Sequence, residues 1–185
     1  MRPFPSLRRA GGDLPGGDQR SVPYRPPVQQ DPVFGFRLHD VDAAINKMLA
    51  LAGRTEARDY VDTLHAHRTC LSLGAMAWAA CGKDPGYTAE FLLGQCQRHA
   101  AVTQADLDRL DLRERLDARA LKAAWIEAVA QGRALFAGLP PEELGCLYLD
   151  AENRPLTPDP ASPAFSRLTR HAGRPGGAWP TVWLA

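Results

Sequence analysis

The pattern of apolar and polar positions predicts helices through most of the middle of the chain. Between 43 and 52 every residue is apolar except Asn46 and Lys47. A helix without a polar face is typical of a buried helix. Asp40 is the expected N-cap of this helix, and Gly53 is expected to end it. A lysine among apolar neighbours needs an anion beside it, because an unpaired buried charge is costly.

A second helix is expected to follow directly, from about Thr55, as its N-cap, to about His67. Arg54, Arg58 and Asp62 recur at intervals of four residues. Side chains at that spacing stack along one helix face, so a charged face beside the apolar one is predicted.

Further helices and strands follow from the same periodicities. The expected helices lie at about 73–80, 88–99, 104–110 and 117–137, and the expected short strands at 33–38 and 146–149. The sequence therefore predicts a mainly α fold, a helical domain of about six helices with one or two short strands.

Composition divides the chain into three parts. Residues 1–27 are crowded with Pro, Gly and Arg and lack an apolar period, so this tail is expected to be disordered. Residues 28–150 carry the helical pattern, and residues 151–185 are expected to form an irregular Pro/Gly-rich tail. Two GGD triplets in the first part invite comparison with a phosphate loop, but no predicted strand precedes them.

The overall composition is that of an ordinary globular protein, with 45% hydrophobic and 23% charged residues among 185. A net charge of +1 argues against a strong global attraction to nucleic acid or membranes. No stretch has the length of a membrane span. The four cysteines lack short spacing and are interpreted as buried thiols of a cytoplasmic protein.

The charged positions of the first two helices are the main candidates for chemistry. Lys47 either binds a phosphate group and offsets negative charge, or extends its ammonium to water as a surface lysine. Asp59 and Asp62 are neighbours on one helix. They pair with Lys47, bind a metal, act as a base, or form an ordinary surface ladder with Arg54 and Arg58.

His65, His67 and Cys70 resemble part of a zinc site. Residues two apart on a helix point in different directions, and no CxxC pair completes the set. We therefore expect no metal ligands among them.

The stretch from Leu38 to Asp62 also resembles a known family. It reads Leu38-His39, Asp42-Ala43-Ala44, Asn46-Lys47, Leu49-Ala50-Leu51-Ala52-Gly53-Arg54, Glu56, Arg58-Asp59 and Asp62. This pattern resembles the C-terminal part of nucleotidyltransferases related to the AbiEii abortive-infection toxin of toxin–antitoxin systems. The resemblance extends from about residue 28 to the end of the chain.

The resemblance implies roles for these residues. Lys47 would contact nucleotide phosphate, and Asp59 would be the paired acidic residue that activates the acceptor. Arg54, Arg58, Asp62 and Asn46 would support the site. The family implies Mg²⁺ and a nucleoside triphosphate as cofactor and substrate, with RNA as a possible acceptor and a cognate antitoxin as a possible partner.

The motif that holds Mg²⁺ in that family is missing from the expected place. No Gly-Ser dipeptide occurs in the chain, and the Asp-x-Asp triplets at 40–42 and 106–108 lie at or within predicted helices. The chain is therefore expected to be a truncated nucleotidyltransferase, active only with a complementing half. A non-catalytic helical module that binds a partner protein, and a nucleic-acid-binding helical domain, are the alternatives.

Overall fold

The computed structural model describes residues 29–33 and 35–172. The expected disorder of residues 1–27, and the part of the expected Pro/Gly-rich C-terminal tail from residue 173 on, lie outside the described residues. Within them the expected fold class is confirmed, since the chain is mainly helical.

Six α-helices, four strands and two short 3₁₀ turns follow one another along the described chain. The helices are α1 (Asp40–Gly53), α2 (Ala57–Thr69), α3 (Leu73–Ala80), α4 (Ala89–His99), α5 (Gln104–Asp108) and α6 (Ala118–Gly138). The strands are β1 (Gln29–Asp31), β2 (Gly35–Arg37), β3 (Cys146–Leu149) and β4 (Thr169–Ala172), and the 3₁₀ turns are η1 (Pro141–Glu143) and η2 (Phe165–Arg167).

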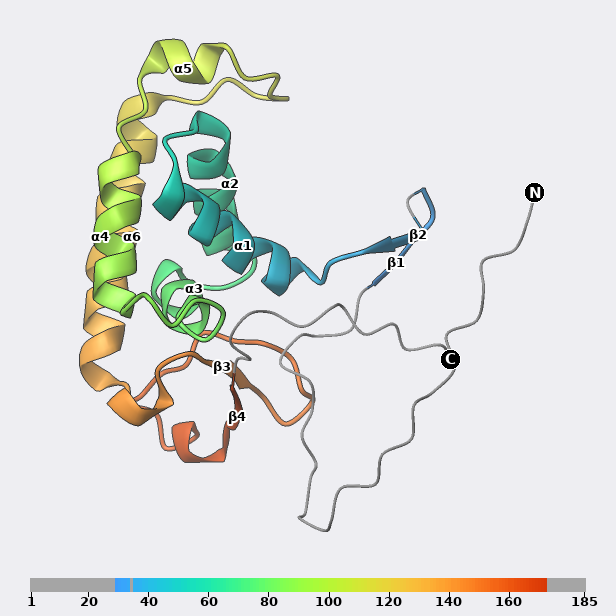
Figure 1. The fold of residues 1–185 in the computed structure, drawn as a ribbon, viewed down its shortest axis with the longest axis vertical. Coiled ribbons are helices and arrows are strands. Elements are labelled where there is room, and N and C mark those ends of the chain that lie inside the picture. The colour runs from blue at the N-terminus through green and yellow to red at the C-terminus, as the bar shows by residue number, and fades with distance from the viewer. Residues whose placement is uncertain (1–28, 34, 173–185) are drawn as a thin grey trace.

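The helices pack around α3, the most deeply buried element. Every residue of α3 is buried, because all eight are apolar or glycine. α4 and α6 lie side by side along the length of the molecule, with α1, α2 and α3 against them (Figure 1). The core therefore lies between the α4–α6 pair and the first three helices.

A glycine contact fixes the crossing of α3 and α6. A Cβ atom at Gly74 would lie 2.6 Å from the Cα of Gly132, and one at Gly132 would lie 3.1 Å from the Cα of Gly74. A Cβ atom at 2.6 Å from backbone is not tolerated, so position 74 needs glycine, and a Cβ at position 132 would force its neighbours apart.

The β3–β4 hairpin packs against the end of α3. β3 pairs antiparallel with β4, from Cys146 opposite Ala172 to Leu149 opposite Thr169. Gly145, just before β3, has a φ of +91° and would place a Cβ 2.8 Å from the Cα of Gly82. The turn after α3 is therefore pressed directly against the start of β3.

β4 corrects one expectation. The composition predicts an irregular tail from residue 151 on, yet residues 169–172 form a strand. Its four residues have no strong alternating pattern. Arg170 lies over the rings of Tyr148 and Phe165, and its Nε donates to Glu143 at 2.8 Å. Long-range packing of this kind stabilises strands that propensity alone does not predict.

Two predicted helix starts are shifted. His39, not Asp40, caps α1, and its Nδ1 accepts from the Val41 amide at 3.3 Å. α2 begins at Ala57 after Glu56, so Thr55 is not its N-cap. Thr55 Oγ1 lies 2.6 Å from Nδ1 of His99 instead. Asp40 pairs with Arg37 instead, so both expected cap residues bind a side chain and not a free helix amide.

The β1–β2 hairpin projects away from the helices (Figure 1). β1 pairs only with β2, from Gln29 opposite Arg37 to Asp31 opposite Gly35. Val33 is 79% and Phe36 47% exposed. This hairpin therefore presents apolar side chains to its surroundings.

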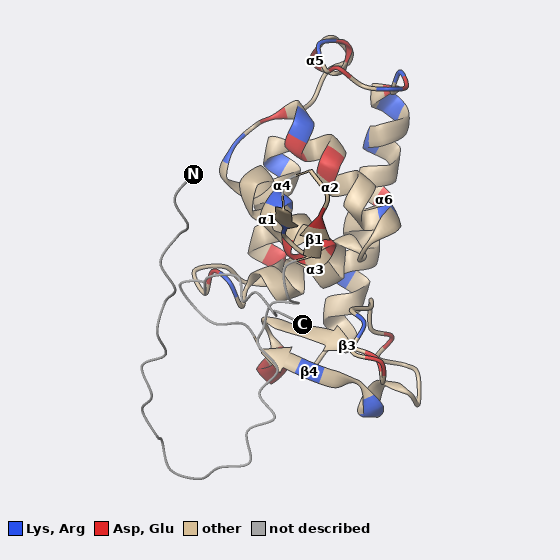
Figure 2. Ribbon diagram, turned by 90° about the vertical axis from the view of Figure 1, so that its right-hand side faces the viewer, with Lys and Arg blue, Asp and Glu red and all other residues tan. Residues whose placement is uncertain are grey.

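Charges of both signs are interspersed along the helices (Figure 2). Within the part of the chain that the structure describes, no helix has both the length and the apolar character needed to cross a membrane. Several of the charged side chains form ion pairs where α1 meets its neighbours.

Candidate functional site

A groove lies between α1 and α2. It has a volume of about 560 Å³ and is completed by Pro155, which follows β3. Each helix contributes residues three or four apart, because such positions share one helix face. The lining comprises His39, Asp40, Val41, Ala43, Ala44, Lys47, Asp62, His65, Ala66, Thr69, Cys70 and Pro155. Alanines on both facing helices leave the space open.

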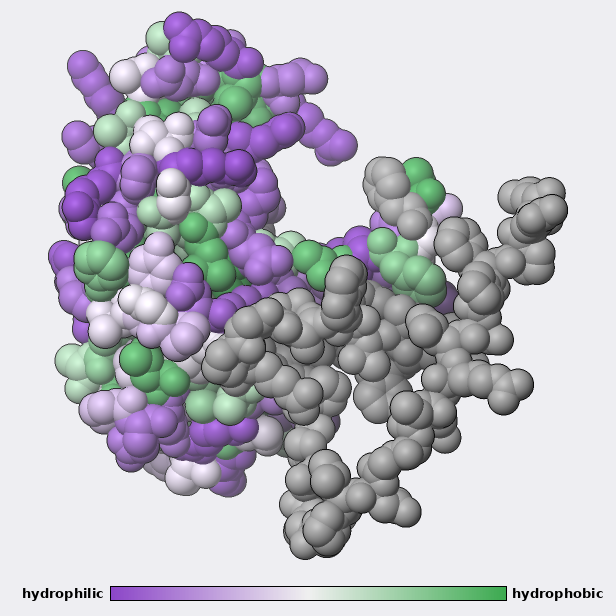
Figure 3. Space-filling view, in the orientation of Figure 1, coloured by the Kyte–Doolittle hydropathy of each residue, from purple (hydrophilic) through white to green (hydrophobic). Residues whose placement is uncertain are grey.

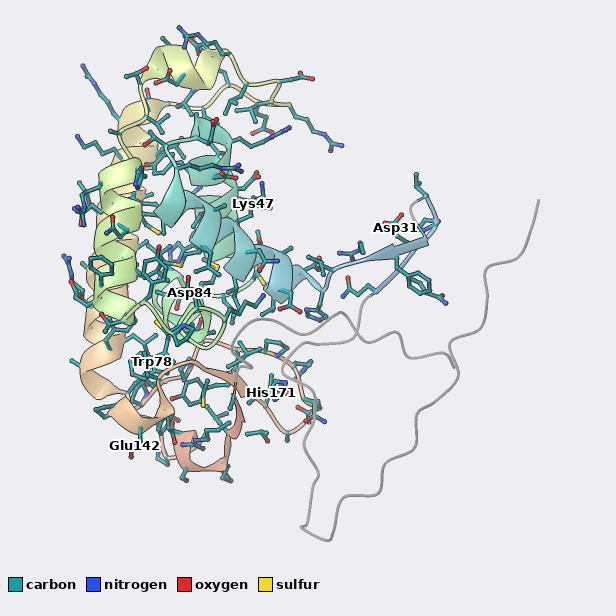
Figure 4. All side chains as sticks on the ribbon, viewed as in Figure 1. Asp31, Lys47, Trp78, Asp84, Glu142 and His171 are labelled. Carbon is teal, nitrogen blue, oxygen red and sulfur yellow. The ribbon has the colours of Figure 1, made fainter. Side chains whose placement is uncertain are left out.

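The surface is hollowed where the β1–β2 hairpin leaves the helical body (Figure 3). Lys47 lies on that side of the helices (Figure 4). The groove is thus open to the surroundings, and the lysine singled out by the sequence lies on its wall.

Lys47 is held between two carboxylates of α2. Its Nζ is 2.9 Å from Oδ2 of Asp62 and 3.2 Å from Oδ1 of Asp59. Arg54 pairs with the other oxygen of Asp59, with its Nε 2.7 Å from Oδ2. We refer to Lys47, Arg54, Asp59 and Asp62 as the Lys47 cluster. Its charges sum to zero, with two cations and two anions.

The two carboxylates of the cluster differ in burial. The side chain of Asp59 is 2% exposed, whereas that of Asp62 is 41% exposed. Burial raises the pKa of Asp59, but hydrogen bonds from Arg54 and Lys47 outweigh it and hold the pKa below its usual value. The hydrogen bond that Lys47 donates to Asp62 raises the pKa of Lys47 against the opposing effect of burial. Lys47, Arg54 and Asp59 are therefore charged at neutral pH.

Lys47 is less buried than its apolar neighbours in the sequence suggest. Its side chain is 39% exposed, because Ala43 and Asn46 beside it on α1 are themselves exposed. A run of alanines looks apolar in sequence although alanine is tolerated on a surface. Lys47 meets both a buried anion and the open groove.

Arg58 and Asn46 lie apart from the Lys47 cluster. Arg58 is exposed on α2 and belongs to none of the ion pairs of the cluster. The prediction that Arg54, Arg58 and Asp62, spaced four residues apart, stack along one helix face is wrong. Arg54 precedes α2 and pairs with Asp59. Asn46 accepts from Lys83 on another side of α1.

The most buried ion pair found here was not anticipated. Lys83, in the turn after α3, places Nζ 2.7 Å from Oδ1 of Asp42, and their side chains are 6% and 4% exposed. The same ammonium donates to Asn46 at 2.9 Å. The sequence signal is weak, since a lysine in a Gly-Lys-Asp-Pro-Gly turn normally predicts exposure.

The histidines and Cys70 do not gather into a metal site. His67 Nδ1 accepts from the amide of Leu73 at 2.9 Å, at the start of α3. His65 and Cys70 instead line the groove. In residues 29–33 and 35–172 no group of His, Cys, Asp and Glu side chains is arranged to hold a metal ion. These residues therefore do not fit the Mg²⁺ that the family resemblance implies.

The Lys47 cluster and the groove beside it are the best candidate site. They combine an oriented ammonium, an exposed carboxylate and an alanine floor. No family model, curated protein or solved structure matches the chain.

Proposed function

We propose that the groove between α1 and α2 is the nucleotide-binding part of an AbiEii-like nucleotidyltransferase. The observation that carries the proposal is the placement of Lys47, on the wall of the groove and held by Asp59 from behind. An ammonium has three donors, so Lys47 can stay bonded to Asp59 and still offer donors to phosphate.

The dimensions of the groove support this proposal. Small-molecule sites commonly enclose roughly 300–1,000 Å³, and this groove has about 560 Å³. Ala43, Ala44 and Ala66 give a flat apolar floor suited to a base, with Lys47 at the charged wall for phosphate.

The geometry favours a positioning role for Asp59. One of its oxygens pairs with Lys47 and the other with Arg54, and its pKa is lowered. A carboxylate with a lowered pKa is a weak base, so activation of the acceptor by Asp59 is disfavoured. We assign it the task of orienting the two cations.

Catalysis would need groups beyond those described. Mg²⁺ supplies charge neutralisation of the triphosphate in such reactions, and the described residues do not fit it. The proposal for this part of the chain is therefore binding and orientation of the nucleotide, whose transfer to RNA or another acceptor depends on ligands from elsewhere.

Calorimetry with ATP, with and without Mg²⁺, tests the proposal. We expect Lys47→Met to weaken binding by about tenfold, the loss of one charge-assisted hydrogen bond. Arg58→Met is the matched control, since it removes an equal charge from the same pair of helices outside the cluster. Equal losses in Lys47→Met and Arg58→Met would refute it, as would absence of ATP binding both by the unmodified chain and by the variant Asp62→Asn.

The β1–β2 hairpin favours a second candidate, a non-catalytic module that binds a partner such as an antitoxin. Exposed Val33 and Phe36 give it an apolar contact surface. Under this alternative ATP leaves the protein unaffected, whereas Phe36→Ser lowers partner affinity. Calorimetry without heat of ATP binding, together with association that Phe36→Ser abolishes, would favour it.

A further inference from the structure

The two carboxylates that hold Lys47 face different surroundings. Asp62 lines the groove, whereas Asp59 lies behind it and is almost fully buried. A ligand in the groove therefore meets Asp62 before it meets Asp59.

The two carboxylates also differ in how firmly they are held. Asp59 has Arg54 as a second cationic partner. In the described part of the chain, the ion pair of Asp62 is with Lys47 alone. Exposed ion pairs are weak because water replaces the lost partner at little cost. Asp62 can therefore release Lys47, while Asp59 keeps it.

We propose that Asp62 is the charge gate of the groove: an anionic ligand binds by taking the Lys47 ammonium from Asp62. This inference rests on the proposed nucleotide site. With Asp62 in place the cluster is neutral, and an incoming anion meets a carboxylate at the same wall. With Asp62 turned away from Lys47, the ammonium keeps Asp59 as its one carboxylate partner in the cluster, and its freed donor can face a ligand in the groove.

The test compares anion affinity in two neutralising variants of the full chain. Asp62→Asn removes the gate. Asp40→Asn is the matched control, because Asp40 also lines the groove and is also ion-paired, with Arg37, but does not touch Lys47. The probes are metal-free ATP and uncharged adenosine, measured by calorimetry at one ionic strength.

We expect Asp62→Asn to bind ATP about two- to fivefold more tightly than the unmodified chain, the strength of one exposed ion pair. Asp40→Asn should change ATP affinity less, and adenosine affinity should be the same in all three proteins. An ATP affinity raised only by Asp62→Asn, even where the unmodified chain binds too weakly to measure, supports the gate.

Two results overturn the gate while the proposed function stands. One is unchanged or weaker ATP binding by Asp62→Asn with measurable binding by the unmodified chain. The other is an equal gain in Asp40→Asn, which would reduce the effect to net charge. If neither the unmodified chain nor Asp62→Asn binds ATP, the proposed function fails and the gate fails with it. Thermal unfolding of each variant shows whether it is folded.

Discussion

The buried pair of Lys83 and Asp42 allows a quantitative prediction about stability. Lys83→Met keeps most of the side-chain volume and removes the charge. The carboxylate of Asp42, whose side chain is 4% exposed, then lacks the Lys83 ammonium that lies 2.7 Å from its Oδ1 in the unmodified protein. Breaking one side of a buried ion pair costs about 3–5 kcal/mol. Asn46 loses a donor as well, although its exposure lets water replace it.

The expected free energy of unfolding of Lys83→Met is therefore lower by about 3–5 kcal/mol. Most of this loss reflects the abandoned charge, so removing that charge too should restore stability. The double variant Lys83→Met/Asp42→Leu is expected to recover at least half of the loss, because apolar replacements of buried pairs are often neutral.

Urea denaturation followed by far-ultraviolet circular dichroism measures these values, with both single variants completing a double-mutant cycle. The reasoning is refuted if Lys83→Met costs less than about 1 kcal/mol, the value of an exposed pair. It is also refuted if the double variant is as unstable as the two single variants added together.

Two further predictions concern the α3 contacts and pH. Gly132→Ala should destabilise the protein by about 1–3 kcal/mol, because its Cβ would be forced against Gly74. Gly94→Ala is the control: its added Cβ meets open space, so it should stabilise the protein by up to about 1 kcal/mol. Equal shifts of the urea midpoint in the two variants would contradict the packing argument. Burial lowers the pKa of His67 in the folded protein below its ordinary value of 6.5. The folded state therefore favours the neutral imidazole, which accepts a hydrogen bond from the Leu73 amide. The contribution of His67 to the free energy of unfolding is fully present above pH 6.5 and is lost as the pH falls through the lowered pKa. The drop in unfolding free energy between about pH 7.5 and about pH 5.5 should be smaller in His67→Asn, and an identical drop would show that another group is responsible.

Local patterns predicted the helices well. The stretch 73–80 is entirely apolar or glycine and forms α3 with the expected bounds. Thr103 and Asp106 form a capping box at the start of α5, where the sequence predicts a helix to begin. In both cases the decisive interactions lie within one turn of chain, where spacing alone sets the geometry.

Contacts between distant residues escaped prediction. The spacing of Lys47, Asp59 and Asp62 suggested a cluster, and the structure brings them together. Which carboxylate is buried depends on how α2 packs, and no helical period encodes that. The pair of Lys83 with Asp42 joins residues far apart in the chain, so only the folded topology reveals it.

Pro155 has a consequence for how the protein is made. It lines the groove between α1 and α2, although it follows β3 and lies far behind both helices in the chain. During synthesis these helices emerge from the ribosome long before Pro155 does, so the groove stays unfinished while most of the core is already available. Under the proposed function, a nascent chain without Pro155 presents an incomplete groove, so nucleotide binding has to wait until this segment has been synthesised.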